Sequence, residues 1–433
     1  MPQGRIARLV GLGLAAGELA IGGAVEGLRR LGAPGSAAAG SVFLTVRGAE
    51  RLASRLARLR GAAMKLGQLL SLEGDHLVPP EFSAALAQLR AGANPMPRAQ
   101  LHRVLGREWG AGWQRRLAHF DESPIAAASI GQVHRARTRD GRELALKVQY
   151  PGVARSIDGD VDNVAVLLRL LNLLPLGIDV AGLAAEAKRQ LHAEADYLAE
   201  GRHLTRFRRL VADEPRLAVP RVHADFTTRR VLAMDFVHGE PLEALADAGV
   251  AQRVRDRAGA ALERLLFREL FEFRTMQTDP NAGNYLWDAA ADRIVLLDFG
   301  ATQEFPRALV ERYRRITRAV LAGDAAQIAA IATEIGYLAP GDAADRVAAV
   351  VDVVQLVCEP LRHRGAYDFG ASDLPARTRD LGFDLAFRQG LLRAPPPETL
   401  FLHRKLVWSY LVLKRIGARV DARALILPFV DPG

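Results

Sequence analysis

The chain has 433 residues but only one cysteine, Cys358. A single cysteine allows no intramolecular disulfide and no thiolate metal site, as is typical of proteins in a reducing compartment. The ten histidines form no HExxH motif and no close cluster, so the sequence gives no support for a zinc site. It also lacks a zinc finger and any basic run interleaved with aromatic residues, so no nucleic-acid partner is expected.

The balance of charges is basic, with 58 lysines and arginines against 49 acidic residues and a net charge of +9. An arginine-rich composition, an anionic membrane surface and nucleic acid each explain such an excess, and the missing nucleic-acid motifs count against the third. About half of the residues (49%) are hydrophobic, enough for a core of one kinase-sized unit or two ordinary domains.

Residues 6–28 form the most apolar segment of the chain. Their number suits a bilayer span, but Glu18, Glu26 and six glycines interrupt them. The acid in mid-segment and the missing cleavage site also argue against a signal peptide. The pattern favours an interfacial or docking helix, and an amphipathic helix packed on its own domain stays open.

The periodicity of the remaining chain predicts helices first, then a small sheet with helices, and then a helical lobe, which is an α+β arrangement. The predicted helices cover 41–72, 98–109, 153–174, 180–211 and much of the chain after Pro306. The predicted strands cover 125–137, 143–149, 217–226, 230–236, 285–287 and 294–297. The first two strands are joined by Arg139-Asp140-Gly141, a hairpin turn signal.

A glycine-loop frame precedes a lysine at the end of a strand. Protein kinases carry glycine at the first, third and sixth loop positions, valine at the eighth, and then a strand lysine. The same frame runs here through Ala126, Ala127, Ala128, Ser129, Ile130, Gly131, Gln132 and Val133, with alanine at the first two glycine positions. Lys147 closes the run Leu-Ala-Leu-Lys, where a lysine would reach the α- and β-phosphates of ATP. Alone, it would read as a surface lysine.

Two acidic motifs follow in the order that kinases use. Asp279 and Asn284 are five residues apart in QTDPNAGN, the spacing of the kinase catalytic loop. Asp298 begins an Asp-Phe-Gly triplet after an apolar strand. Oxygen ligands such as those of Asn284 and Asp298 are what phosphate-bound Mg²⁺ requires. The ordered set predicts an ATP/ADP- and Mg²⁺-binding kinase-like core, with Asp279 and Lys147 as catalytic candidates.

On these motifs the chain resembles the UbiB-type, or aarF-domain-containing, atypical kinases, and is most similar to their coenzyme Q branch. Met64-Lys65-Leu66-Gly67-Gln68 matches the family's KxGQ signature, and PIAAASIGQVHRA matches its alanine-rich nucleotide loop. Glu194 and Asp196 match its ExD motif, and QTDPN and LLDFGATQEF match the coenzyme Q branch. The resemblance covers roughly residues 40–320.

The resemblance implies a protein-kinase-like two-lobe fold with an N-terminal helical extension and a mainly helical C-terminal lobe. It implies that Lys65 and Gln68 lie over the nucleotide site, with Gly67 as a family-specific residue of the same motif. It also implies that Lys65 pairs with Glu194 and that Glu200 is the helix partner of Lys147. The KxGQ helix would then fill the groove that ordinary kinases use for peptides. Lys65 lies among leucines, a costly place for an unpaired charge, although a lysine reaching to the surface is the competing reading.

Two departures from protein kinases weaken the case for ordinary protein phosphorylation. Alanine resists left-handed backbone conformations by roughly 1 kcal/mol or more, so Ala126 and Ala128 predict a stiffer lid than glycines. No APE motif and no long activation segment follow Asp298, and Gln277-Thr278 replaces the usual His-Arg. For Glu194 and Asp196, a solvated acidic helix face is the alternative to a functional role.

The ordered motifs predict an Mg²⁺-dependent atypical kinase or ATPase, and the resemblance implies that it supports ubiquinone biosynthesis at a membrane surface. The expected partners are ATP, anionic membrane lipid, and quinone precursors or quinone-biosynthesis proteins, with a cytoplasmic or peripheral inner-membrane location. A nucleotide-sensing scaffold and a true protein kinase are the alternatives. Four segments are expected: an N-terminal helix (1–40), the KxGQ extension (41–115), an N-lobe with inserted helices (116–238) and a helical C-lobe (239–433).

Overall fold

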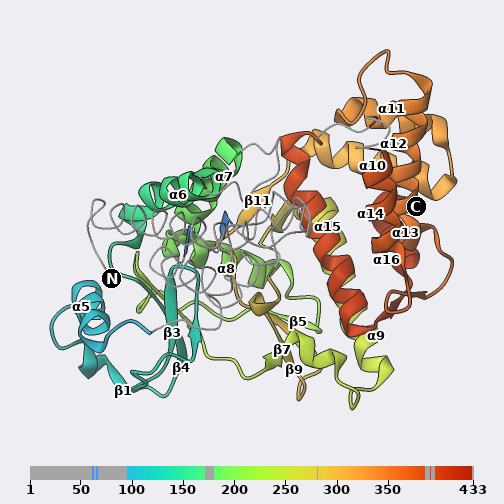
Figure 1. Cartoon of the computed structure of the whole chain (residues 1–433). Helices are drawn as coiled ribbons and strands as arrows, with labels where there is room; N and C mark the ends of the chain where they lie inside the picture. The colour runs from blue at the N-terminus through green and yellow to red at the C-terminus, as the bar shows by residue number, and fades with distance from the viewer. Residues whose placement is uncertain are drawn as a thin grey trace, which may run out of the picture. The chain divides into compact units, whose positions relative to one another are not determined.

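The computed structural model of the chain describes residues 61–62, 65–66, 95–170, 180–279, 281–385, 391 and 395–431 (Figure 1). The expected helix over 6–28, most of the KxGQ extension, Gly67 and Gln68 lie outside these residues. The chain divides into two compact units. The first runs to Arg202 and includes Val222–Phe236, and the second comprises His203–Arg221 and Val237–Gly433.

The first unit is built on a five-stranded antiparallel sheet with the strand order β1-β3-β4-β6, in which β2 pairs with β3. Its strands are β1 (Leu117–Phe120), β2 (Ala126–Ala127), β3 (Gly131–Thr138), β4 (Glu143–Gln149) and β6 (Val231–Asp235). Every residue of β4 after Glu143 is buried, as expected for a central strand. Helix α5 (Arg98–Trp109) and the short 3₁₀ helix η2 (Trp113–Arg116) supply Leu101, Leu105 and Trp113 to the core of this sheet.

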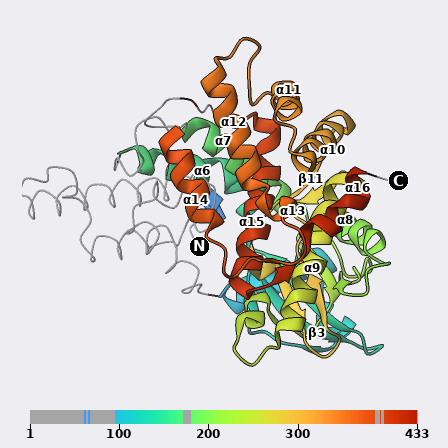
Figure 2. The same ribbon diagram turned by 90° about the vertical axis from the view of Figure 1, so that its right-hand side faces the viewer.

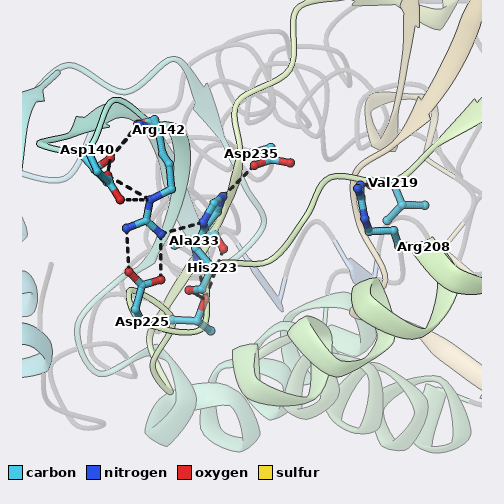
Figure 3. A network of polar contacts seen from close by, with 10 residues as sticks. Asp140, Arg142, Arg208, Val219, His223, Asp225, Ala233 and Asp235 are labelled. Atoms are coloured by element: carbon cyan, nitrogen blue, oxygen red, sulfur yellow. Dashed lines mark hydrogen bonds and ion pairs between the residues drawn. The ribbon is translucent and has the colours of Figure 1, made fainter.

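A polar network holds the turn between β3 and β4 (Figure 3). The Arg142 guanidinium donates to both carboxylate oxygens of Asp225, at 3.2 and 2.9 Å, and to Nδ1 of His223 at 3.1 Å. Because arginine can only donate, Nδ1 of His223 is the acceptor, and its Nε2–H is free to donate to Asp235 at 2.7 Å. The turn itself uses Gly141 at φ +89°, as the Asp-Gly signal predicted.

Three helices follow β4: α6 (Val153–Leu170), α7 (Val180–Glu194) and α8 (Tyr197–Leu210). The prediction of one helix over 180–211 was wrong, because the helix is interrupted at Ala195-Asp196. The Asp196 carboxylate accepts hydrogen bonds from the backbone N–H groups of Leu198 and Ala199, which begins α8 as a new helix. The hydrophobic periodicity does not reveal this helix boundary, because the apolar spacing is the same in both helices.

The described residues of the second unit contain three small sheets. The largest has the order β5-β10-β9-β7, the second pairs β11 with β8, and the third is a short pair near the C-terminus. The strands of the first two sheets are β5 (Leu217–Ala218), β7 (Glu240–Pro241), β8 (Thr275–Gln277), β9 (Tyr285–Asp288), β10 (Arg293–Leu296) and β11 (Thr302–Glu304). The predicted strand over 217–226 was too long: only Leu217–Ala218 pairs in a strand, and Val222 makes an isolated bridge to Met234.

Helices form most of the second unit (Figure 2). They are η3 (Leu242–Ala246), α9 (Gln252–Phe267), the π-helical turn η4 (Arg268–Glu272), the 3₁₀ turn η5 (Ala282–Asn284), α10 (Arg307–Ala322), α11 (Ala325–Ile335), α12 (Ala344–Val357), α13 (Glu359–Arg362), α14 (Leu374–Phe383), α15 (Pro397–Ile416) and α16 (Ala422–Val430). Both α15 and α16 pack against α9. A short pair of strands, β12 (Tyr367–Asp368) and β13 (Arg419–Val420), also joins this unit.

In the described part of the chain, no helix combines the length and the apolar character needed to cross a membrane.

Candidate active site

Lys147 lies near the end of β4, in the middle of the sheet. Its neighbours across the two ladders are Val133 on β3 and Leu232 on β6. Its ammonium group donates to both carboxylate oxygens of Glu200 on α8, at 2.8 and 3.0 Å, and both side chains are buried. A buried ammonium needs such a partner, because isolating the charge from water would cost several kcal/mol. The sheet and α8 thus bring together Lys147 and Glu200.

The alanine-rich loop is a tight hairpin. Ala126 and Ala127 on β2 pair with Val133 and Gln132, and the turn is closed by a hydrogen bond from the Ala128 N–H to the Gly131 carbonyl at 2.9 Å. In the described residues, only Arg274 and Asp292 among non-glycine residues have positive φ. The loop is therefore formed without the left-handed conformations that alanine disfavours.

Gly131 is required for close packing. A Cβ at this position would lie 2.4 Å from the carbonyl oxygen of Val148 and 3.0 Å from the hydroxyl of Tyr197. Its φ lies outside the left-handed region, so backbone freedom is not what selects glycine here. The sixth position of the loop frame keeps its glycine because the neighbouring strand and α8 leave no room for a side chain.

Glu194, at the end of α7, joins two motifs that are far apart in the sequence. One carboxylate oxygen accepts from Lys65 Nζ at 2.7 Å, and the other accepts from Ser129 Oγ in the alanine-rich loop at 2.5 Å. Lys65 is only 1% exposed, which excludes the reading of a lysine that reaches to the surface. Glu194 is also buried, so it does not belong to a solvated acidic face. The carboxylate of Asp196 caps α8.

The second unit carries the other candidate residues. Asp279 and Asn284 lie in the loop 278–284 between β8 and β9, and the Asn284 side-chain amide donates to the Asp279 carboxylate at 3.2 Å. The loop is fixed at its start because the backbone N–H and the hydroxyl of Thr278 both donate to the carbonyl of Ala301. Ala301 directly follows the Asp-Phe-Gly triplet, so the two motifs support each other.

The hairpin of β9 and β10 brings Asn284 and Asp298 to the same end. Tyr285 pairs with Leu296, so Asn284 precedes one strand where Asp298 follows the other, and the Leu297 N–H donates to the Asn284 carbonyl at 2.9 Å. The Asp298 carboxylate accepts from the Gly300 N–H at 2.8 Å.

The side-chain oxygens of Asn284 and Asp298 are of the kind that binds Mg²⁺. A carboxylate and an amide oxygen are hard ligands, and this ion binds through one or two protein groups together with phosphates and water. The described residues include no cluster of three histidine, cysteine or acidic side chains that could hold a metal ion.

The phenylalanine of the triplet is anchored by the part of α8 that belongs to the second unit. Phe299 is buried, its ring centroid lies 4.3 Å from that of Phe207, and its carbonyl contacts the imidazole Nδ1 of His203 at 3.1 Å. This packing fixes the backbone that leads from Asp298 into β11.

Comparisons with known proteins show the family of this chain. The ABC1 atypical kinase-like domain matches residues 88–332, which is more than half of the chain. The chain belongs to the ABC1 atypical kinase-like family. It is 38% identical to the rat protein named "Atypical kinase COQ8B, mitochondrial" over 98% of this chain and 80% of the relative. It is 34% identical to the Saccharomyces cerevisiae "Atypical kinase COQ8, mitochondrial" over 98% of this chain and 84% of the relative.

A solved structure is similar to this chain over most of its length. The complex of Rv3197 with erythromycin from Mycobacterium tuberculosis matches with a TM-score of 0.63 and 26% sequence identity, over 89% of this chain and 96% of that one. The predictions of the family and of a kinase-like α+β fold are thus confirmed. The chain is accordingly an atypical kinase.

The sequence did not reveal a group of buried polar side chains behind the loop 278–284. They are Glu269, Gln277, Tyr285 and Lys405. Burial alone would lower the pKa of Lys405, but the facing carboxylate of Glu269 and the Tyr285 hydroxyl raise it, so the ammonium stays charged. Lys405 lies outside the residues that the ABC1 domain matches.

A sequence signal for Lys405 did exist. The buried stripe of α15 comprises Leu402, Lys405, Ser409, Leu413 and Ile416, at the three- and four-residue spacing of a helix face. A lysine and a serine in such a stripe indicate buried polar partners on other elements.

Proposed function

We propose that this atypical kinase binds ATP with Mg²⁺ and transfers or hydrolyses the γ-phosphoryl group in support of ubiquinone biosynthesis at a membrane surface. The observation that carries the proposal is the meeting of Asp279, Asn284 and Asp298 at one end of the β9–β10 hairpin. The residue types and their order are those that kinases use to hold Mg²⁺ and to orient the attacking oxygen.

In the first unit, Lys147 would bind the α- and β-phosphates. Both carboxylate oxygens of Glu200 accept from its ammonium and orient it, and the alanine-rich hairpin 126–131 would cover the phosphates with backbone N–H groups. Val133, the cross-strand neighbour of Lys147, would contact the nucleotide next to that lysine. Each of these residues would act by position and charge, which is how most of the barrier is lowered in phosphoryl transfer.

In the second unit, Asp279 would accept a hydrogen bond from the attacking hydroxyl or water and take up its proton. Asn284 and Asp298 would hold the cation, which when bound neutralises charge on the β- and γ-phosphates. The amide N–H₂ of Asn284 fixes the Asp279 carboxylate, and its amide oxygen is left for the metal. The γ-phosphorus–oxygen bond to ADP breaks as the bond to the attacking oxygen forms.

The buried Lys65 argues against an ordinary protein kinase. Its pairing with Glu194, which also accepts from Ser129, joins Lys65 of the KxGQ motif to the alanine-rich loop. We propose that the extension, with Gly67 and Gln68, takes the place of a peptide substrate. Helix α10 begins at Arg307, nine residues after Asp298, which leaves no long segment on which a peptide could dock.

The acceptor and the partners follow from the resemblance to the coenzyme Q branch and from the names of the relatives. We propose a quinone precursor with a phenolic hydroxyl, or water, as acceptor, and quinone-biosynthesis proteins as partners. The basic composition would favour anionic lipid at the inner-membrane surface, where the protein would act from the cytoplasmic side.

The test is an ATPase assay on the purified protein, with Mg²⁺, with and without anionic liposomes and a phenolic quinone precursor. Asp298→Asn and Asp279→Asn should each lower kcat by roughly 10²–10³-fold. Asp288→Asn is the matched control: this aspartate lies at the opposite end of the same hairpin, where it pairs with Arg293 at 3.0 Å. Its kcat should stay within twofold of the unaltered protein.

Full hydrolysis by Asp298→Asn would contradict the assignment of the metal ligand. Tight nucleotide binding without hydrolysis in the presence of anionic membrane would instead favour the nucleotide-sensing scaffold. Phosphorylation of other proteins by the intact chain, lost in Asp279→Asn, would favour a true protein kinase.

A further inference from the structure

The loop 278–284 is held at both ends by one lysine from the C-terminal region. Gln277 is the last residue before the loop and Tyr285 the first after it. Lys405 Nζ on α15 donates to the Tyr285 hydroxyl at 3.0 Å and to the Gln277 side-chain oxygen at 3.4 Å. The Tyr285 hydroxyl also donates to that same oxygen at 3.4 Å. The two ends of the loop therefore converge on one ammonium group.

Glu269, in the π-helical turn η4, completes this arrangement. Its carboxylate forms an ion pair with Lys405 at 3.3 Å and accepts from the backbone N–H of Gln277 at 3.0 Å. Lys405 is 3% exposed and Glu269 is 1% exposed. Helix α15 also contributes Trp408, whose ring centroid lies 4.7 Å from that of Tyr285. The base of the loop is thus enclosed by α15 and η4.

The contacts continue from this base to the carboxylate proposed to act on the acceptor. The Gln277 side-chain N–H₂ donates to the backbone carbonyl of Asp279 at 2.9 Å, while its oxygen receives Lys405. Asp279 is fixed from the far end of the loop by Asn284. One side-chain amide thus separates the Lys405 ammonium from the backbone of Asp279.

Stability alone does not explain a buried ion pair at this position. Well-packed apolar side chains of similar volume are often as stabilising as a buried pair, or more so. The pair does what apolar side chains would not do: its ammonium and carboxylate bond to atoms at both ends of the seven-residue loop. In transferring a phosphoryl group, displacing a reacting carboxylate by about 1 Å costs as much as 10²-fold in rate.

We propose that Lys405, together with Glu269, is a positioning residue that keeps Asp279 and Asn284 in the positions needed for phosphoryl transfer. The inference rests on the proposed function for its effect on turnover, but the effect on the loop itself is independent of activity. It gives the C-terminal helix α15, which lies outside the ABC1-matched residues, a role in the chemistry of the core.

The main test uses the full chain with Lys405→Met and Glu269→Gln combined. This pair removes both buried charges at once, and the glutamine oxygen can still accept from the Gln277 N–H. Tyr285→Phe is a milder variant, which removes only the hydroxyl that Lys405 contacts. Lys414→Met is the matched control on the same helix, because Lys414 donates to the backbone carbonyls of Gly370 and Ser372, away from the loop.

Two measurements decide the outcome: steady-state ATP hydrolysis, and hydrogen exchange of the peptides that cover residues 275–288. We expect the double variant to lose at least tenfold in kcat with KM for ATP within twofold, and its loop amides to exchange at least tenfold faster. Tyr285→Phe should lose threefold or more in kcat, and Lys414→Met should match the unaltered protein in both assays.

A kcat within twofold of the unaltered protein in both Lys405 and Tyr285 variants would overturn the inference. If the unaltered protein neither hydrolyses ATP nor transfers its γ-phosphoryl group to a phenolic precursor, the proposed function fails. Loop exchange then decides alone: faster exchange in the variants supports the inference, and unchanged exchange overturns it. If the double variant does not fold, both measurements on Tyr285→Phe decide in the same way.

Discussion

Glu263 should make the stability of the second unit fall with rising pH. This glutamate on α9 is 7% exposed and accepts one hydrogen bond, from Ser409 Oγ on α15 at 3.0 Å. Burial raises its pKa from 4.5 to about 7, and the Ser409 hydroxyl offsets only part of that effect. The contact lies one helical turn from Lys405, on the face by which α15 packs on α9.

The direction of this pH dependence follows from the protonation of Glu263 in the folded and the unfolded state. In the folded protein the carboxyl keeps its proton up to about pH 7, whereas in the unfolded chain it loses the proton near pH 4.5. Between these values the folded state binds more protons, so the free energy of unfolding falls as pH rises. The contribution is fully present below pH 4.5 and lost above pH 7. A difference of about 2.5 pH units corresponds to about 3 kcal/mol.

Glu263→Gln removes the titration and keeps the shape. The amide oxygen can still accept from Ser409, and any cost of burying the amide N–H₂ is the same at every pH. The unfolding free energy of the variant, minus that of the unaltered protein, should therefore grow by about 3 kcal/mol between pH 4 and pH 8. Taking the difference also cancels other groups, such as half-buried His403, whose pKa is lowered to about 4 by desolvation.

Urea unfolding followed by circular dichroism at pH 4, 6 and 8 measures this difference. Glu334→Gln is the control, since this exposed glutamate has its pKa lowered by Arg315 and should show no such growth. Parallel stability curves for Glu263→Gln and the unaltered protein would refute the reasoning, because the carboxyl would then titrate as it does in water.

Two further predictions concern the alanine-rich hairpin. Ala128→Gly should loosen the turn and shift the preference between ATP and ADP, measured by calorimetric titration of both nucleotides, and unchanged affinities for both would count against the stiff-loop argument. Gly131→Ala should lower the unfolding free energy by about 2 kcal/mol, because its Cβ would meet the Val148 carbonyl oxygen at 2.4 Å. Gly106→Ala is its control in urea unfolding: the nearest atom to a Cβ there is 4.0 Å away, so stability should not fall.

Local patterns predicted the elements that depend on local interactions. The helix over 98–109 and the turn at Gly141 were found where expected, because apolar spacing and glycine's freedom at positive φ act within a few residues. The strands β8 and β11 were missed, since three residues carry no measurable alternation. A single helix was predicted over 180–211 because the apolar spacing is continuous there, but the cap at Asp196 begins a new helix.

The candidate residues were found from sequence because phosphate and Mg²⁺ chemistry restricts the residue types, their order and their spacing. Which of them meet was decided by the tertiary structure. The partners of the buried charges lie far along the chain: Lys65 and Glu194 are 129 residues apart, and Lys405 and Gln277 are 128 apart. A charge in an apolar helix face shows that a partner is needed, but only packing decides which one.

The sequence by itself thus determined the family and the kinase-like fold and supplied the candidate residues of the site, because each depends on residue type and order. The tertiary structure alone decided that Glu194 serves both Lys65 and Ser129, and that Lys405 holds both ends of the loop 278–284. The physical reason is that burial penalises every unpaired charge equally, wherever it lies in the sequence, so its partner is selected by proximity in space.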